Sequence, residues 1–93
     1  MFIFKIHSYI LNVDWYVYIA QARTGRYYTG VSTDPLRRIE EHNAGMGAKF
    51  SKDQGNLKLL YASQGYEKSV AWKREMQIKG WSRWKKEKLI TGE

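Results

Sequence analysis

The stretch WYVYIAQARTGRYYTGV, residues 15–31, decides the fold of this chain. Its first part, Trp15–Gln21, is rich in aromatic and β-branched residues, which suit a pleated strand. Ala22–Gly25 then supplies a turn with a glycine for a positive φ, and the remainder returns as a second strand. Alternation places Val17 on one face of this unit and Tyr18 on the other. The stretch therefore predicts a β-hairpin.

A helix start follows the hairpin directly. Asp34 has the side chain of an N-cap, and Pro35 suits the first helical position. The pattern predicts a helix over residues 35–43, ended by a glycine two residues later. We expect Leu36 and Ile39 to form the buried ridge of this helix.

The second half of the chain predicts one strand and two helices. A glycine-rich, basic loop occupies residues 45–56, and a third strand spans Leu57–Ala62. A long helix covers residues 67–79, and Ser82 caps a last helix that ends near Ile90. The order β-β-α-β-α-α is typical of an α+β domain, with a small three-stranded antiparallel sheet flanked by helices.

The length and composition bound what the chain can be. Its 93 residues make one small domain, which we place at residues 15–91. Residues 1–14 are expected to be either an N-terminal leader or an extra edge strand, because their apolar run is far shorter than the roughly 20 residues of a membrane helix. The absence of cysteine excludes disulfides, cysteine-ligated zinc and thiol nucleophiles. It fits a reducing cytosol, so we expect a cytoplasmic protein with no membrane partner.

The charge of the chain points to a polyanionic partner. The formal net charge is +7, and a small basic domain attracts polyanions through its summed field. The alternative is a solvated lysine-rich surface without a partner. The basic residues cluster near the end of the chain, at Lys73, Arg74, Lys79, Arg83, Lys85, Lys86 and Lys88.

Glu75 stands out within the long second-half helix. The apolar arc of that helix is defined by Ala71, Trp72, Met76 and Ile78, and Glu75 falls inside it. A buried carboxylate is costly unless it is paired, protonated or bound to a metal. Both an ion pair with a nearby basic residue and a metal-binding role stay open.

Two short tyrosine motifs, Tyr16-Val17-Tyr18 and Tyr28-Thr29-Gly30, are followed along the chain by Arg38, His42 and Glu75. In this order and spacing, these residues resemble the GIY-YIG nuclease superfamily, most closely its small stand-alone members. The likeness covers about residues 15–91. This chain has Tyr16 where the family name has glycine, and no asparagine follows Glu75, although many members carry one there.

The resemblance implies a metal-dependent endonuclease that hydrolyses DNA phosphodiester bonds, with five catalytic residues. Glu75 would hold Mg²⁺ or Mn²⁺, and Arg38 would lie against the scissile phosphate. Tyr18 is the candidate general base, with a pKa that we expect Arg38, the metal and the basic field to lower. His42 could relay the proton instead, so the choice of base between these two stays open. Tyr28 would orient the nucleophile or contact the phosphate.

We expect basic side chains to bind nucleic acid through the negative charge of its phosphate backbone. No base-reading module is visible in the sequence, so we expect recognition of branched, nicked or damaged duplex DNA, as in DNA repair, or targeting by a protein partner. RNA is not excluded by charge. We expect Trp72, Trp81 and Trp84 to be core residues rather than stacking platforms. The residues predicted to bind nucleic acid are Arg37, Lys49, Lys52, Lys73, Lys79, Arg83 and Lys85.

Two other functions fit the same sequence. One is a module on the same fold that binds nucleic acid without cutting it, which the missing asparagine favours. The other is a structural or interaction subunit whose surface tyrosines contact a protein partner.

Overall fold

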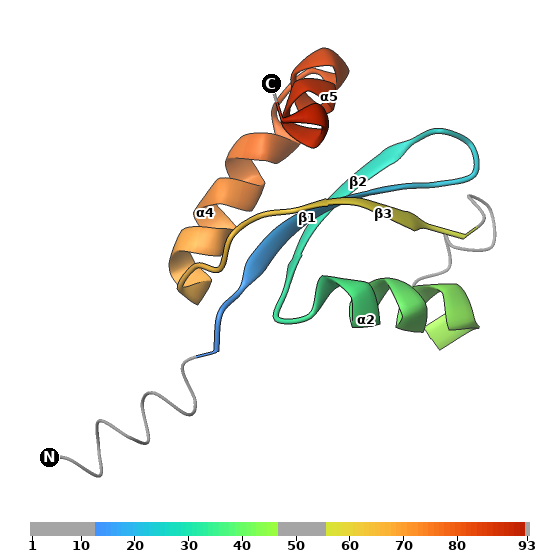
Figure 1. Cartoon of the computed structure of the whole chain (residues 1–93), viewed down its shortest axis with the longest axis horizontal. Helices are drawn as coiled ribbons and strands as arrows, with labels where there is room; N and C mark the ends of the chain where they lie inside the picture. Colours follow the sequence, from blue (N-terminus) through green and yellow to red (C-terminus); the bar gives the residue numbers. More distant parts are fainter. Residues whose placement is uncertain (1–12, 47–55, 93) are drawn as a thin grey trace, which may run out of the picture.

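The computed structural model describes residues 13–46 and 56–92, and a three-stranded antiparallel sheet lies at its centre (Figure 1). The strands are β1 Tyr16–Gln21, β2 Tyr27–Ser32 and β3 Lys58–Ala62, as the sequence predicts to within a residue or two. Their order is β2-β1-β3, so β1 is central and β2 is an edge strand of this sheet.

The hairpin of β1 and β2 sets which side chains share a face. Tyr18 pairs with Gly30, and Ala20 pairs with Tyr28. The turn between the strands uses Gly25 at a φ of 95°, which a glycine adopts without steric cost. Because paired residues project to the same side of an antiparallel sheet, both motif tyrosines, Tyr18 and Tyr28, lie on one face.

Helices cover both faces of the sheet (Figure 1). One face carries α2, Pro35–Glu41, and the other carries α4, Lys68–Lys79, and α5, Arg83–Thr91. The alternation of β1 divides the core accordingly. Val17 and Ile19 pack with residues of α4, while Ala20 packs with Ile39 of α2 and with Leu57. The α+β architecture predicted from the order of elements is confirmed.

The helix ends use the residues that the sequence offers for them. Asp34 accepts a hydrogen bond from the Arg37 amide at 3.2 Å, and Ser82 accepts one from the Lys85 amide at 3.2 Å. After α2 the chain makes a π-helical turn, η1 His42–Met46, in place of a plain helix end.

The side chain of Asn43 in that turn ties it to the sheet. It donates to the Leu57 carbonyl at 2.9 Å and accepts from the Leu57 amide at 2.8 Å. Both hydrogen-bonding groups of the Leu57 backbone are thereby satisfied just before β3 begins.

Three apolar helix residues expected in the core lie at the surface. Leu36 is 57% exposed, Trp72 51% and Met76 70%. Ile39 of α2 is buried as predicted. The reason for the difference is geometric, since a helix that lies on a small sheet buries only a narrow stripe of its circumference.

Some predictions lie outside the described residues. These are the structure of residues 1–12 and of residues 47–55, which include Lys49 and Lys52. Val13 and Asp14 are described and belong to no strand. Among residues 13–46 and 56–92, no helix has the length and apolar character needed to cross a membrane.

Candidate active site

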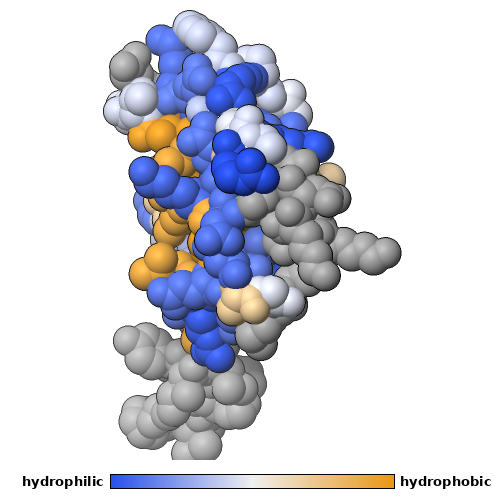
Figure 2. Space-filling view, turned by 90° about the vertical axis from the view of Figure 1, so that its right-hand side faces the viewer, coloured by the Kyte–Doolittle hydropathy of each residue, from blue (hydrophilic) through white to orange (hydrophobic). Residues whose placement is uncertain are grey.

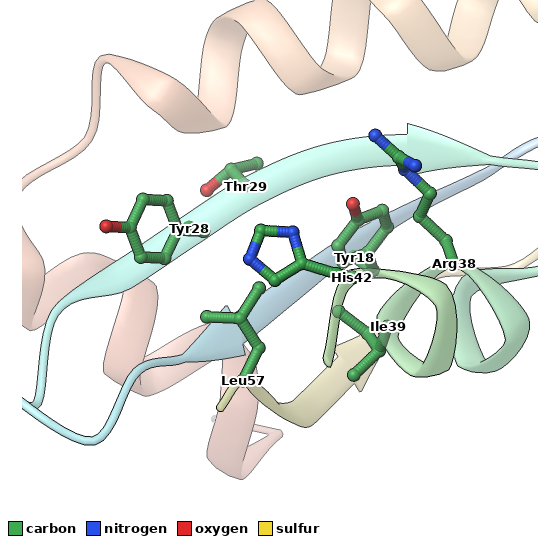
Figure 3. Close-up of a pocket in the computed structure, with 7 residues that line it drawn as sticks. All are labelled: Tyr18, Tyr28, Thr29, Arg38, Ile39, His42 and Leu57. Carbon is green, nitrogen blue, oxygen red and sulfur yellow. The ribbon is translucent and has the colours of Figure 1, made fainter. Parts of the chain in front are cut away.

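A hollow of about 140 Å³ opens between the sheet and α2 (Figure 3). It brings together Tyr18 and Tyr28 from the hairpin, Arg38 from α2, and His42 from the turn that follows. Thus the predicted catalytic residues of the first half of the chain share one cavity. The complete lining is Tyr18, Tyr28, Thr29, Arg38, Ile39, His42 and Leu57.

Tyr18 crosses the edge strand at Gly30. A Cβ atom added to Gly30 would lie 2.7 Å from the Tyr18 hydroxyl oxygen and 2.8 Å from the ring carbon that bears it. Both distances are shorter than a non-bonded carbon contact allows. Glycine is therefore needed at position 30 so that the Tyr18 phenol can lie across β2.

Arg38 is the hydrogen-bond partner of the Tyr18 phenol. Figure 3 shows the guanidinium and the hydroxyl at the same end of the hollow. Burial raises the pKa of Tyr18 above its ordinary value of 10.0, and this outweighs the lowering by the charge and hydrogen bond of Arg38. In this protein without ligands the expectation of a lowered Tyr18 pKa is wrong, and the phenol is protonated at neutral pH.

His42 is buried and lies four residues after Arg38. Burial lowers the pKa of His42 below its ordinary value of 6.5, and the positive charge of Arg38 lowers it further. The imidazole is therefore neutral at pH 7, so that one of its ring nitrogens is an acceptor. Figure 3 shows this ring between the side chains of Tyr18 and Tyr28.

Tyr28 occupies the other end of the hollow. Its hydroxyl points away from Tyr18 and Arg38 (Figure 3), and the guanidinium of Arg26 lies 5.5 Å from the centroid of its ring. Arg26 was not among the predicted binding residues. It lies two residues before Tyr28, in the turn that precedes β2.

Glu75 belongs to α4, on the other face of the sheet, yet its charge acts on the Tyr18 phenol and raises its pKa. Glu75 is therefore within electrostatic range of the phenol, although the two side chains come from elements on opposite faces of the sheet. The Glu75 side chain is 16% exposed, and its Oε2 lies 3.1 Å from Nζ of Lys79. The predicted ion pair with a basic residue thus exists, and Lys79 is the partner.

Glu75 can hold a divalent ion only if other ligands come from outside the protein. Among residues 13–46 and 56–92, no group of three or more His, Cys, Asp or Glu side chains could hold a metal. One carboxylate suffices for Mg²⁺ or Mn²⁺ when waters and substrate phosphate oxygens supply the other ligands. The residues present therefore fit an ion that binds together with its substrate and displaces the Lys79 ammonium from Glu75.

Two predicted nucleic-acid contacts are each paired with a glutamate one helical turn away. Arg37 is on the outer side of α2, where it pairs with Glu41 at 3.2 Å as the i,i+4 spacing indicates. Lys79 lies beside Glu75, and its charge also reaches Tyr18.

The remaining described candidates lie on α4 and α5. Lys73 is exposed, and Nζ of Lys85 lies 4.4 Å from the ring centroid of Trp81. Arg83 instead stacks on Tyr27 at 4.1 Å and pairs with Glu87 at 3.2 Å. These contacts join α5 to the hairpin, so Arg83 has a structural task beside any contact with nucleic acid.

Comparison with known proteins identifies the family of this chain. Residues 14–88 match the GIY-YIG catalytic domain. A UPF0213 protein of Klebsiella pneumoniae subsp. pneumoniae is 37% identical over 87 residues, which cover 94% of this chain and 82% of that protein. A UPF0213 protein of Yersinia enterocolitica is 37% identical over 79 residues, which cover 85% of this chain and 81% of that protein.

A solved structure is similar as well. The solution NMR structure of a UPF0213 protein from Bacillus halodurans shares 38% sequence identity and has a TM-score of 0.53. The similarity covers 84% of this chain and 83% of that one. The family predicted from the tyrosine motifs is therefore confirmed: this chain belongs to the GIY-YIG nuclease superfamily, together with the small UPF0213 proteins.

Proposed function

We propose that this chain is an endonuclease that hydrolyses DNA phosphodiester bonds with the help of a divalent metal ion. The observation that carries the proposal is the hollow that gathers Tyr18, Tyr28, Arg38 and His42. The charges of Arg38 and Glu75 both act on the pKa of the Tyr18 phenol there. These residues come from elements on opposite faces of the sheet, and packing alone does not require them to meet. The membership of a nuclease superfamily with nucleic-acid substrates supports the same reading.

Arg38 would stabilise the phosphate during hydrolysis. Attack on phosphorus builds negative charge on the non-bridging oxygens, and a guanidinium fork matches those oxygens. The hydrogen bond to Tyr18 holds the Arg38 side chain in place before the substrate arrives. A preorganised charge of this kind contributes on the order of 3 kcal/mol to the transition state.

We assign the role of general base to His42 and a positioning role to Tyr18. A neutral imidazole accepts a proton at pH 7, whereas a phenol with a raised pKa does not. Tyr18 accepts the hydrogen bond of Arg38, so its own O–H is free to donate to the attacking water or to a phosphate oxygen. The proton of that water then passes to a ring nitrogen of His42.

Glu75 would hold the metal ion, either Mg²⁺ or Mn²⁺. When bound, such an ion stabilises the charge on the leaving oxygen as a Lewis acid. A lone carboxylate that is already paired with Lys79 binds a cation weakly, so we expect metal and DNA to bind cooperatively.

The proposed substrate is a DNA structure rather than a sequence. The elements found in residues 13–46 and 56–92 include no zinc finger and no helix-turn-helix reader. Branched, nicked or damaged duplexes are therefore the substrates to test, as in DNA repair in the cytoplasm, with RNA as a further arm. A protein partner that directs the enzyme to its substrate would take the place of such a base-reading element.

A second candidate is a binding module on the same fold that does not cut. The ion pair of Glu75 with Lys79 favours it, because it neutralises the one carboxylate that the metal needs.

One assay separates the two candidates. Purified protein is incubated with branched, nicked and linear DNA and with RNA, in Mg²⁺, Mn²⁺ or EDTA. Nicking should require the metal and disappear in Glu75→Gln. Glu67→Gln is the matched control, because this glutamate begins the same helix and makes no side-chain capping hydrogen bond. Tight salt-dependent binding without cleavage in any metal would favour the binding module.

A further inference from the structure

A second hollow, of about 380 Å³, lies between α4 and α5 and takes no part in the chemistry described above. Its volume is within the range of small-molecule pockets, about 300–1,000 Å³. We refer to it as the tryptophan hollow. It is lined by Arg74, Trp81, Trp84, Lys85, Lys88 and Leu89.

The tryptophan hollow pairs indole rings with cations. The guanidinium of Arg74 lies 5.0 Å from the ring centroid of Trp81, and Nζ of Lys88 lies 4.6 Å from that of Trp84. No carboxylate contributes to the lining. The site therefore offers flat apolar surfaces and positive charge together, which is the chemistry that holds stacked bases and their phosphates.

The two tryptophans differ in how firmly they are held. Trp81 packs against the core cluster of the sheet and α4, which fixes its ring. Trp84 is 64% exposed and forms the outer wall. The expectation that both are core residues is therefore wrong for Trp84, which presents a large aromatic face to solvent.

The tryptophan hollow and the proposed metal ligand Glu75 lie on two flanks of α4. Ala71 and Ile78 form the buried stripe of this helix, and at about 100° per residue Arg74 and Glu75 flank that stripe on opposite sides. Arg74 lines the tryptophan hollow, while Glu75 acts on Tyr18. Since a helix is about 10–12 Å across, the tryptophan hollow and Glu75 are separated by no more than the width of α4, a span that a few nucleotides of a bound strand can cover.

The surface of the protein suits such a path. Figure 2 shows one side of the molecule, on which hydrophilic side chains predominate and hydrophobic ones gather in a strip along one edge. The net charge of the whole chain, +7, favours a phosphate backbone as its partner.

We propose that the tryptophan hollow binds the unpaired strand of a DNA substrate by stacking its bases on Trp84 and Trp81. The proposal rests on the proposed function, since it takes nucleic acid as the substrate. It adds a reason for preferring nicked or branched DNA, because only unpaired bases are free to enter.

Binding of a short fluorescein-labelled oligothymidylate in EDTA tests this directly. Trp84→Ala should weaken binding roughly 5- to 100-fold, the range of one lost base stack. Trp72→Ala is the matched control, because Trp72 is also exposed and also has a cation, Lys68, over its ring, but it lies outside the hollow. Trp84→Phe, which keeps a ring, should retain most of the affinity.

An abasic oligomer of equal length separates stacking from charge. It should bind less tightly than oligothymidylate, and Trp84→Ala should leave its affinity unchanged. Equal affinity for the two oligomers, or no effect of Trp84→Ala on oligothymidylate, would overturn the proposal. Displacement of oligothymidylate from the hollow by poly-glutamate at lower concentration would overturn it in favour of an acidic protein partner.

The same variants distinguish this inference from the proposed function. If the parent protein nicks DNA in a metal-dependent manner but Trp84→Ala binds oligothymidylate normally, only the proposal for the tryptophan hollow is refuted. If no nicking is seen under any condition but oligothymidylate binding still depends on Trp84, only the catalytic assignment is refuted.

Discussion

At the scale of single residues, the site depends on Gly30, which has no Cβ atom. Gly30 provides the space that the Tyr18 phenol fills, so the glycine of the second motif and the tyrosine of the first form one steric unit. Arg38 and Glu75 then act on that phenol from two sides. The two motifs therefore constrain each other through direct contact.

Replacing Gly30 with alanine should remove activity while the fold survives. The new methyl group would push the Tyr18 phenol away from Arg38, and nicking should fall about 10²-fold, as for the loss of one preorganised hydrogen-bond donor. Thermal unfolding and nicking rate are the measurements. Gly80→Ala is the control, since its Cβ would meet nothing closer than 3.6 Å. Full activity in Gly30→Ala would show that the phenol does not need this position.

The pH dependence of cleavage should identify the base. Because the pKa of His42 is lowered from 6.5, its neutral form predominates at pH 7, so the rate at saturating DNA should rise with pH on the acidic side of neutrality and then level off. A Tyr18 phenolate acting as the base would instead make the rate climb about tenfold per pH unit towards pH 10. His42→Gln should abolish the acidic limb, and a profile that rises throughout would contradict the assignment.

At the scale of elements, side-chain contacts of Arg83 and Glu87 hold α5 to the hairpin. Arg83 stacks on Tyr27, pairs with Glu87 and donates to the Gly25 carbonyl at 2.9 Å. Tyr27 also donates to Glu87 at 3.3 Å. The last helix is thereby positioned relative to the turn between β1 and β2.

Arg83→Ala should destabilise the protein without touching the chemistry. A cation–π contact and a hydrogen bond to the backbone are lost, which together contribute about 1–2 kcal/mol. Urea unfolding measures the change. Lys73→Ala, which removes an exposed charge from α4, should stay within about 0.5 kcal/mol of the parent. A fall in kcat for Arg83→Ala at saturating DNA, without any loss of stability, would contradict the structural role.

At the scale of the whole molecule, patterns along the chain predict the frame of the fold, and spatial packing determines the site. The strand alternation and the caps at Asp34 and Ser82 could be predicted because they are local. The exposure of Leu36 could not, since it depends on how α2 lies on the sheet. The raised pKa of Tyr18 could not either, because burial is a tertiary property. The pairing of Glu75 with Lys79, by contrast, was readable from their i,i+4 spacing.

The net charge predicts how salt acts on the protein. DNA affinity should fall linearly with the logarithm of salt concentration, because bound phosphates release their counterions, while kcat at saturating DNA should hardly change. Arg37→Ala should flatten the slope by about one unit and spare kcat, whereas Arg38→Ala should lower kcat about 10²- to 10³-fold. Fluorescence anisotropy and single-turnover nicking over a salt series measure both. Identical behaviour of the two variants would argue against a catalytic Arg38.

The position of β2 at the edge of the sheet, between Tyr18 and Glu75, has a consequence for assembly. In the described sheet, β2 has a neighbour on one side only, and the two groups lie to either side of it. An edge strand readily accepts another chain by backbone pairing. A peptide or a second copy that paired with β2 would block access of a phosphate to these groups. Oligomerisation through this edge strand would therefore inhibit the proposed cleavage.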